Sequence, residues 1–439
     1  MKIVFGFVGV LVAVSSSLPV QNWIPYESYD GHQVISIKTS TEAHAQALLG
    51  LSKEEGLRDI GFWKEPRKIG GTVDVQIKPE HKPLIEAFLE KHGLKYEVKI
   101  VDLGDLVAKE KKALENRTVF KTGDDPKDLT LGQVHNLREI YAYLDSTAKA
   151  YNGTASLFSI GKSYEGRSLL GLKIGNPGNN KKAAFMHGCL HSREWIGCAS
   201  MLYIINELTQ NAAKHKTLLD ALDVYILPVA NPDGYEITWN QQRFWRKTTS
   251  GPHGFRDGVP CFGADANRNF DFHFREAGYS DDPCDYEQYA GPYAFSEVES
   301  KAIADFLTAH KDTVKAYFDV HAYSELFMYP YGYAKTYPAD IEKLRSVAVN
   351  ATDAINAVNG GQFKQGPIVD IIYAASGSTI DWAKGVLNIP YTYALELAPK
   401  DTKLVPGDGF LINFSEVIPA AKECWAGLQV VLNAVAAGK

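Results

Sequence analysis

A histidine and a glutamate three residues apart have the residue types and the spacing of a metal site. His191 and Glu194 follow an apolar run at residues 183–186. A neutral imidazole and a carboxylate at this spacing can both turn toward one ion, and a catalytic zinc commonly takes three protein ligands and keeps a fourth position for water. His321, at the end of a second apolar stretch, is the candidate for the third ligand. Since most chance matches to His-x-x-Glu are ordinary surface pairs, the pair alone is weak evidence.

Glu396 could serve the same site as a general base. It lies near the end of the alternating segment 391–397, on a face where burial would raise its pKa, and such a carboxylate can take a proton from an attacking water. The plainer interpretation is a salt-bridged glutamate at the end of a strand. The residue pattern alone does not decide whether Arg246 has a functional or a structural role. An arginine beside a tryptophan, here Trp245, is more often a stacking pair.

The segments around these residues predict an α/β domain. From about residue 131 onward, helical patterns alternate with short apolar runs, which is typical of a mixed, mostly buried central sheet with helices on both faces. Ligands of open α/β sheets collect outside the carboxyl ends of the strands, which would bring His191, His321 and Glu396 to one site. The predicted strands include 169–174, 183–186, 222–228 and 315–320, and the predicted helices include 134–143, 196–209 and 296–310.

The chain before this domain shows a smaller α+β pattern. Alternating apolar residues predict strands and helical spacing predicts helices. Thr41, or the preceding Thr39 and Ser40, could cap the first helix. The predicted strands are 32–37, 72–77 and 95–100, and the predicted helices are 41–54 and 83–92.

The polar segment 107–127 follows this pattern. It has a helical start and then no periodic burial, and its lysines and arginine would be accessible to a trypsin-like protease if exposed. A solvated linker and an activation peptide have the same composition, so the residues alone do not separate them.

The first residues predict a secretory signal peptide. Lys2 gives a basic start, residues 3–14 are apolar, and residues 13–17 offer small side chains for cleavage. The apolar run is shorter than the roughly 20 residues that span a bilayer, so a membrane anchor is disfavoured. We therefore expect a secreted, extracellular protein in which disulfides can form, although five cysteines leave at least one without a partner in the chain.

Length and charge narrow the function classes. The 439 residues are enough for two domains and a sizeable core. A formal net charge of −6 and a pI near 6.1 give no basic surface for nucleic acid. We expect a monomer that binds neither nucleic acid nor membrane.

Residues 191–195 resemble the zinc-binding segment of the metallocarboxypeptidases related to pancreatic carboxypeptidases A and B. Four further segments match that family in the same order, so the chain is identified as a member of it, and Ile380 at the specificity position is typical of the A type. The resemblance runs from about Leu131 to the C-terminus, and a looser match to the family's pro-segment covers the part before it. The four segments are 243–248, 265–270, 321–324 and 372–377, with Glu396 beyond the last.

The resemblance implies a layout for the chain. Residues 1–16 would be the signal peptide, 17–121 an activation pro-domain with its linker, and 122–439 the zinc carboxypeptidase catalytic domain. The pro-domain would be a small α+β sandwich with two helices over an antiparallel sheet. A trypsin-like protease would cut near Lys121, with Arg117 as the alternative. A disulfide would join Cys261 to Cys284.

The resemblance also implies roles at the site. His191, Glu194 and His321 would hold one zinc per chain, Glu396 would take the proton of the attacking water, and Arg246 would stabilise the oxyanion. Asp265 would orient a zinc histidine. The implied substrate contacts are Arg193, Asn267, Arg268, Tyr323, Tyr373 and Phe410, of which Phe410 follows an insertion-like stretch at 398–408 that leaves its alignment open.

Position 380 decides which C-terminal side chain the pocket accepts. The family position that is acidic in enzymes specific for basic residues corresponds to Ile380, and an apolar floor cannot offset the desolvation of lysine or arginine. Asp381 is adjacent, so a slip of one residue would reverse this interpretation, although the Asp381-Trp382 pair anchors the register. Ser378 and Ala394 replace residues usual in pancreatic A-type enzymes, which leaves the preference among aromatic and aliphatic ends open.

The leading hypothesis is a secreted zymogen that hydrolyses C-terminal peptide bonds and releases aromatic or aliphatic residues. Its expected partners are peptide and protein C-termini, an activating trypsin-like protease and proteinaceous carboxypeptidase inhibitors. An inactive homologue that acts as a peptide-binding module is the alternative, but it would require a lost ligand, base or carboxylate clamp. A thermolysin-like endopeptidase would show His-Glu-x-x-His, which is absent, and an aminopeptidase would not need the anion clamp Asn267-Arg268.

Overall fold

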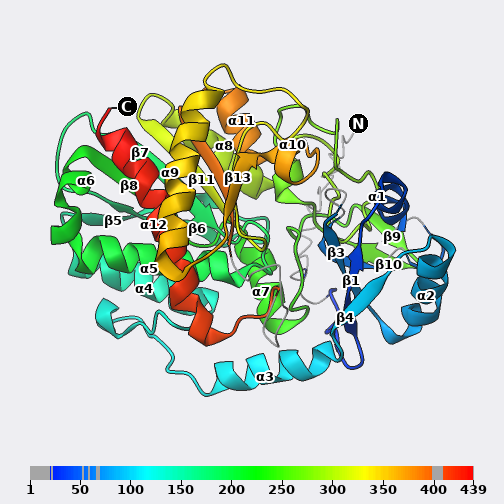
Figure 1. The fold of residues 1–439 in the computed structure, drawn as a ribbon. Coiled ribbons are helices and arrows are strands. Elements are labelled where there is room, and N and C mark those ends of the chain that lie inside the picture. The colour runs from blue at the N-terminus through cyan, green and yellow to red at the C-terminus, as the bar shows by residue number, and fades with distance from the viewer. Residues whose placement is uncertain are drawn as a thin grey trace, which may run out of the picture.

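The computed structural model describes residues 20, 23–51, 54–57, 60–65, 70–397 and 409–438. The expected signal peptide at 1–16 and the insertion-like stretch at 398–408 lie outside the described residues. Within the described parts, no helix has the length and apolar character needed to cross a membrane. The chain forms a large α/β unit and a small unit built on an antiparallel sheet, with the small unit at one side (Figure 1).

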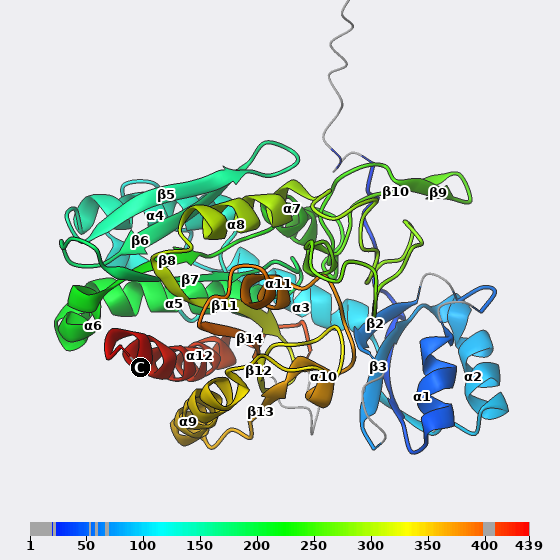
Figure 2. The ribbon, with the colours of Figure 1, turned by 90° about the horizontal axis from the view of Figure 1, so that it is seen from above.

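The small unit is a four-stranded antiparallel sheet in the order β2-β3-β1-β4. Its two helices lie on the side of the sheet away from the large unit (Figure 2), and apolar side chains between them form a separate core. The strands are β1 (Gln33–Lys38), β2 (Gly61–Lys64), β3 (Thr72–Ile77) and β4 (Tyr96–Ile100), and the helices are α1 (Glu42–Leu49) and α2 (Lys82–Lys91).

Helix α1 begins at the expected cap and ends early. The Thr41 hydroxyl accepts a hydrogen bond from the His44 backbone N–H at 3.2 Å, which confirms this residue as the N-cap. The helix ends at Leu49, short of the predicted residue 54. Strand β2 was not predicted from the sequence, and it proves to be the strand of the small unit that reaches the site.

A longer helix than predicted joins the two units. Helix α3 (Leu103–Glu115) is capped by Asp102, whose carboxylate accepts a hydrogen bond from the Gly104 N–H at 2.9 Å. The helix runs along the lower edge of the molecule in Figure 1. Its Glu110 side chain binds Arg243 of the large unit, with Nε and Oε2 2.6 Å apart. The connecting segment is therefore docked by a buried ion pair.

The large unit is built on an eight-stranded mixed sheet in the order β13-β12-β14-β11-β7-β8-β6-β5. Its centre, β14-β11-β7-β8, is parallel. The strands are β5 (Ala155–Lys162), β6 (Ser168–Ile174), β7 (Lys182–Gly188), β8 (Leu222–Leu227), β11 (Val314–Ala322), β12 (Leu326–Tyr329), β13 (Lys364–Pro367) and β14 (Tyr391–Leu397).

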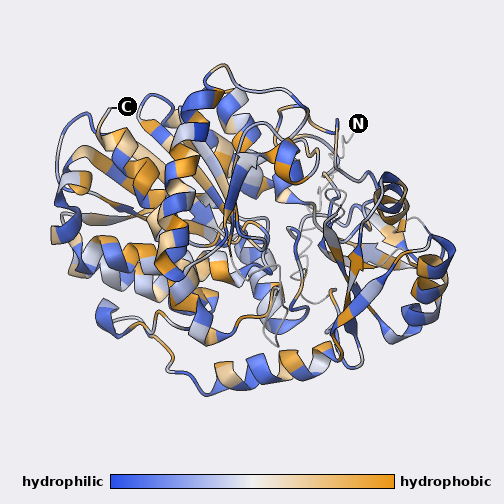
Figure 3. Ribbon diagram, in the orientation of Figure 1, coloured by the Kyte–Doolittle hydropathy of each residue, from blue (hydrophilic) through white to orange (hydrophobic). Residues whose placement is uncertain are grey.

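Helices cover both faces of this sheet because its strands are apolar on both sides. In β7, Ala184 and Met186 join one core, whereas Ala183 and Phe185 join the other. The central strands are correspondingly rich in hydrophobic residues, whereas the edge strand β13 is polar and the helices carry both colours (Figure 3). The first core contains α4 (Leu137–Ala150), α5 (Trp195–Gln210), α9 (Ile341–Asn359) and α12 (Phe414–Ala436), and the second contains α8 (Val298–Ala309) and α11 (Thr379–Gly385).

This arrangement confirms the predicted fold class of a mixed, mostly buried sheet between helices.

Shorter elements complete the large unit. They are α6 (Lys216–Ala221), α7 (Pro232–Asn240), α10 (Ile368–Ile371), the hairpin β9 (Gly254–Arg256) and β10 (Val259–Cys261), and the 3-10 helices η4 (Pro126–Asp128), η5 (Ala212–His215) and η6 (Ala266–Arg268), while η3 (Pro79–His81) belongs to the small unit.

The cysteines divide into one disulfide and three buried thiols. Cys261, at the end of β10, is bonded to Cys284, with the Cα atoms 5.0 Å apart, in agreement with the pairing that the resemblance implied. Cys189, Cys198 and Cys424 are free and buried. The disulfide ties the β9–β10 hairpin to the loop that leads back to the site.

Candidate metal centre and substrate cleft

Three side chains converge where two parallel strands end. His191 lies in the loop after β7, Glu194 is the residue immediately before α5, and His321 is near the end of β11. Because β7 and β11 are adjacent and parallel, their carboxyl ends lie at the same edge of the sheet. The chain order therefore brings residues about 130 positions apart to one point.

The geometry of this group suits a metal ion. Nδ1 of His191 lies 2.8 Å from Oε1 of Glu194, and Nδ1 of His321 lies 3.0 Å from Oε2 of the same carboxylate. The three ligand atoms lie within 4.8 Å of one another, and all three residues are buried. Within the described residues, this is the one group of three or more histidine, cysteine or acidic side chains with such spacing.

The two neighbouring imidazoles stabilise the ionised form of Glu194. Burial opposes ionisation of this carboxylate, but the neighbouring His191 and His321 outweigh it and hold the pKa of Glu194 well below its usual range. The carboxylate is therefore ionised at neutral pH, which is the form that binds a cation.

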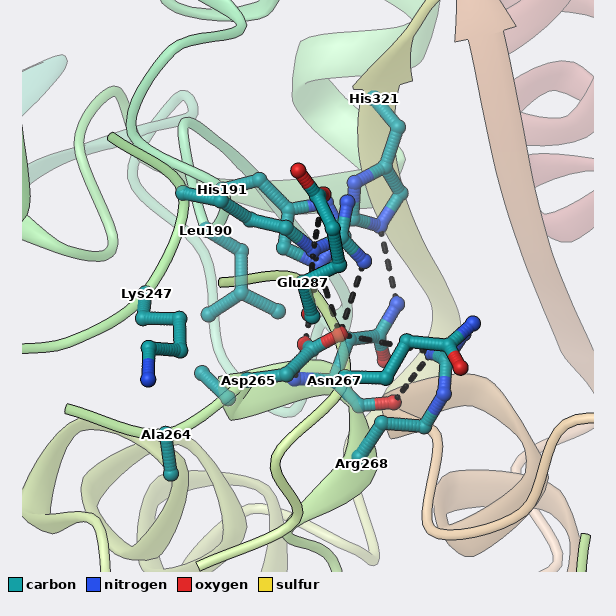
Figure 4. Close-up of polar contacts among 12 residues, drawn as sticks. Leu190, His191, Lys247, Ala264, Asp265, Asn267, Arg268, Glu287 and His321 are labelled. Carbon is teal, nitrogen blue, oxygen red and sulfur yellow. Dashed lines mark hydrogen bonds and ion pairs between the residues drawn. The ribbon is translucent and has the colours of Figure 1, made fainter. Parts of the chain in front are cut away.

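Asp265 lies behind His191 and is fully buried. Its Oδ1 lies 3.1 Å from Nε2 of His191, and its Oδ2 accepts a hydrogen bond from Nη2 of Arg246 at 2.8 Å. Figure 4 shows His191 and His321 side by side, with Asp265, Asn267 and Arg268 beneath them. Burial opposes the charge on Asp265, but Arg246 and His191 hold its pKa well below the usual range.

Glu396 lies directly beside His321 in the sheet. Strand β14 runs parallel to β11, and Glu396 pairs with His321 in the register. The glutamate is half-buried and lines the same cavity as the His-Glu-His group. A carboxylate in this place is within the reach of a molecule bound at the cluster.

One open cavity gathers the predicted site residues. Of these, Asp265 alone does not line it, because this residue lies behind His191. The predicted residues that line the cavity are His191, Arg193, Glu194, Arg246, Asn267, Arg268, His321, Tyr323, Tyr373, Ile380, Glu396 and Phe410.

The guanidinium of Arg268 is fixed in place by hydrogen bonds. Its Nη2 donates to the Tyr373 hydroxyl at 3.0 Å and its Nε donates to the Gly278 carbonyl at 2.7 Å. Asn267 precedes it in η6 and places its side-chain Nδ2 3.1 Å from Nε2 of His321. A guanidinium held in this way can pair with a carboxylate without reorganising.

Apolar side chains also line the cavity, among them Ile380, Ala394 and Met328. Asp381, by contrast, faces the backbone of a neighbouring loop. Its Oδ2 accepts from the Gly332 N–H at 2.8 Å and from the Tyr333 N–H at 3.1 Å, and burial raises its pKa to about 7 against these bonds. The Asp381 carboxylate therefore has a structural role, because it binds the backbone of the neighbouring loop.

Strand β2 of the small unit reaches into the same cavity, which the sequence did not predict. The Phe62 carbonyl accepts from Nη2 of Arg193 at 3.2 Å, and the Trp63 ring lies 5.3 Å from the Phe410 ring between centroids. Glu65 accepts from Gln288 at 2.6 Å, and its charge lies close enough to Arg246 to act on it electrostatically. The small unit therefore covers the site directly.

Two further acidic residues of the site were missed. Glu287 holds Arg193 through two hydrogen bonds, at 2.8 and 2.6 Å, and no motif in the sequence marks it. Asp319 contacts His321, with Oδ2 and Nε2 2.9 Å apart. Asp319 did leave a signal, because residues two apart on a strand project to the same face.

Family models account for most of the chain. Residues 140–427 match a model described as zinc carboxypeptidase, and residues 35–110 match a model described as carboxypeptidase activation peptide. These two matches fall on the large unit and on the small unit respectively.

Curated relatives and solved structures agree with those matches. Mouse carboxypeptidase A1 is 36% identical over 93% of this chain and 94% of its own length, and rat carboxypeptidase A2 is 37% identical over 93% and 95%. A carboxypeptidase B from Astacus astacus is 41% identical over 69% of this chain and 96% of its length. The structure of carboxypeptidase A from Helicoverpa armigera superposes with a TM-score of 0.85 at 28% identity, covering 94% of this chain and 99% of that one.

The His-Glu-His group and the two matched models together place the chain in one family. Mouse carboxypeptidase A1 and rat carboxypeptidase A2 each align with 93% of this chain. This protein belongs to the zinc carboxypeptidases, as an A-type enzyme with an activation peptide.

Proposed function

We propose that this protein is the secreted zymogen of a zinc-dependent carboxypeptidase that releases apolar residues from the C-termini of peptides. The observation that carries the proposal is a single cavity that is lined by the His-Glu-His group, Glu396, the anchored Arg268 and the apolar side chain of Ile380. A metal group beside a carboxylate clamp fits cleavage of the last peptide bond, because the free C-terminus is then held at a fixed distance from the reacting carbonyl.

The donor set fits zinc. Two imidazole Nδ1 atoms and one carboxylate, from His191, His321 and Glu194, are the ligands of many catalytic zinc sites. When bound, zinc supplies a Lewis acid that polarises the scissile carbonyl and lowers the pKa of water. The outward nitrogen of His191 contacts the Asp265 carboxylate, and this fixes Nδ1 of His191 as the inward donor.

Glu396 takes the proton of the attacking water and returns it to the leaving amine. Its place beside His321 in the register and its half-buried position support this role. Arg246 stabilises the charge that develops on the carbonyl oxygen. Its guanidinium is held by Asp265 at 2.8 Å and lies 3.8 Å from Glu194, so it is fixed at the edge of the metal group.

Arg268 and Asn267 bind the terminal carboxylate, and Tyr373 closes over it. The 3.0 Å bond from Arg268 to the Tyr373 hydroxyl supports this assignment, because the two groups already converge on one point of the cavity. Arg193, Tyr323 and Phe410 bind residues on the other side of the scissile bond. Without the clamp, an endopeptidase would be expected.

The side-chain preference is for apolar C-terminal residues. Ile380 and Ala394 line the pocket, while Asp381 accepts two backbone hydrogen bonds from a neighbouring loop, which supports the register in which residue 380 is the floor. A lysine or arginine side chain in this pocket would lose its hydration without gaining a partner.

The small unit keeps the enzyme inactive until a protease removes it. Residues 62–65 line the substrate cavity, so a peptide cannot occupy that part while they are present. Lys121 is exposed, whereas the side chain of Arg117 is 5% exposed and forms an ion pair with Glu139. We therefore place the activating cut, by a trypsin-like protease, at Lys121.

A scan of C-terminal residues on the protease-treated protein tests the proposal. Peptides that end in Phe, Tyr or Leu should lose that residue, and the same peptides with an amidated C-terminus should be stable, because Arg268 then has no carboxylate to bind. Binding of free C-termini without cleavage, in protein shown to contain zinc, would instead establish the inactive peptide-binding module. Cleavage of amidated peptides at the same rate would contradict the clamp.

A further inference from the structure

The two candidate metal histidines are each backed by a different carboxylate. His191 contacts Asp265, as the sequence implied, whereas His321 contacts Asp319, to which no role was assigned. Nε2 of His321 lies 2.9 Å from Oδ2 of Asp319, which is fully buried. The inference that follows concerns Asp319 and rests on the proposed zinc site.

The geometry leaves one acceptor for the outward N–H of His321. The group nearest to Nε2 besides Asp319 is the side-chain amide of Asn267, whose Nδ2 lies 3.1 Å away. That amide nitrogen is a donor, because the same side chain uses its oxygen to accept from the Thr379 N–H at 2.9 Å. A proton on Nε2 can therefore be received by Asp319, and Nδ1 is left free to bind a metal.

Asp319 is itself held by a hydroxyl at the start of α11. Oγ1 of Thr379 donates to Oδ2 of Asp319 at 2.6 Å. The backbone N–H of the same threonine orients Asn267, and the next residue, Ile380, lines the substrate pocket. One residue thus links the carboxylate behind the metal group to the clamp and to the pocket.

The charge of Asp319 is less offset than that of Asp265. Asp265 lies within 4.0 Å of two guanidinium groups, those of Arg246 and Arg268. Among the described residues, no lysine or arginine forms an ion pair with Asp319. Besides His321 and Thr379, this carboxylate contacts His187, with Nδ1 and Oδ1 3.5 Å apart. A carboxylate without a competing cation polarises the N–H that it accepts more strongly.

We infer that Asp319, oriented by Thr379, is a positioning residue that fixes the ring and the tautomer of His321 and so strengthens zinc binding. Carboxylates in this relation to a metal-bound histidine typically contribute a factor of about 10 to 100 in metal affinity. Asp319 contacts His321 and is not a member of the His-Glu-His group, so its effect is expected in zinc retention first and in turnover only as a consequence.

The test measures zinc affinity of the intact chain by competition with a chromogenic chelator. Asp319→Asn keeps the shape of the side chain but removes its charge, and it should bind zinc about 10 to 100 times more weakly than the wild type. The absorption spectrum of the cobalt-substituted protein should shift as well, because the orientation of His321 changes. Unchanged affinity and an unchanged cobalt spectrum in a folded Asp319→Asn variant would overturn the inference.

Matched variants separate this role from a structural one. Asp233 is also fully buried and accepts a hydroxyl hydrogen bond, from Ser163 at 2.7 Å, so Asp233→Asn should lower the unfolding temperature and leave zinc affinity unchanged. If Asp319→Asn does not fold, Thr379→Val and Thr379→Ser decide. Weaker zinc binding in the valine variant with recovery in the serine variant supports the inference, and equal affinity in both contradicts it.

The wild-type measurement keeps the two levels of the argument apart. If the wild-type chain binds no zinc under these conditions, the proposed function fails. If the wild type binds zinc tightly and both Asp319 and Thr379 variants bind it equally well, the proposed function stands and the role of Asp319 alone is rejected.

Discussion

The small and the large unit differ in the hydrophobic core that stabilises each of them. The large unit is stabilised by a sheet buried on both faces, whereas the small unit has a second core of its own and adds Val34, Ile100 and Leu103 to an apolar cluster of the large unit. Polar and aromatic contacts also join the two units. Examples of these contacts are Arg193 with the Phe62 carbonyl, Tyr323 with Asp74 at 3.0 Å, and Arg243 with Glu110 at 2.6 Å.

This difference suggests a division of labour. Every residue to which we assign a chemical role lies in the large unit, and the small unit contributes groups that occupy the cavity. A unit with its own core can leave without unfolding its partner. The predictions below test this division, from changes that should abolish activity to changes that should only loosen the cover.

The largest effect is expected from His191→Ala. This change removes one of three metal ligands and should abolish both zinc binding and peptidase activity, whether or not the small unit is present. Zinc content by elemental analysis and activity on a peptide ending in Phe check it. Stoichiometric zinc in the folded variant would sink the assignment of the metal site.

Glu396→Gln should separate chemistry from binding. The variant should retain zinc and bind a C-terminal product, but its kcat should fall by about 10²–10⁴, since a positioned general base contributes a factor of that size. Stopped-time assays on the activated protein, with zinc content as the control, measure this. A nearly normal kcat would mean that another group takes the proton.

The pocket should discriminate strongly against basic ends. A stranded charge that costs about 3 kcal/mol lowers the rate roughly 100-fold, so C-terminal Lys and Arg should be released at least that much more slowly than Phe. Ile380→Asp should shift the preference toward basic ends, although Ser378 limits how far a long side chain can enter. Equal rates on Lys and Phe in the native enzyme would show that the assigned pocket floor is wrong.

Limited trypsin should raise activity by removing the cover from an intact site. We expect Lys121→Gln to resist this activation and Arg117→Gln to be activated normally, because Arg117 is already engaged by Glu139. N-terminal sequencing of the product and activity on a large peptide are the readouts. Full activity of the uncut chain on large peptides would argue against the division of labour.

The smallest effect is expected from a single contact of the cover. The Trp63 ring lies 4.8 Å from Phe244 and 5.3 Å from Phe410 between centroids, so Trp63→Ala should loosen the small unit by about 2 kcal/mol, roughly 30-fold in its opening equilibrium. The uncut variant should show measurable activity. The control is Trp23→Ala, because the Trp23 side chain is 56% exposed. If neither uncut variant shows activity, Trp63 does not keep the small unit on the cavity.

The sequence determined the parts of the site that depend on local pattern. His191 and Glu194 are three residues apart, and the apolar runs before His321 and around Glu396 predicted strands that β11 and β14 confirm. The cap at Thr41 and the class of the fold followed in the same way, since capping and periodicity involve neighbours in the chain.

Only the tertiary structure decided the parts that depend on distant partners. Strand β2 is four residues long, and its two aromatic residues, Phe62 and Trp63, are adjacent, so the strand has no alternating pattern. Its pairing with β3 and the packing of Trp63 on Phe410 define it instead. Asp319 stands two residues from His321, yet its role depends on Thr379, sixty positions away. Hydrogen bonds and packing between such distant segments form only when the chain is folded, and periodicity carries no trace of them.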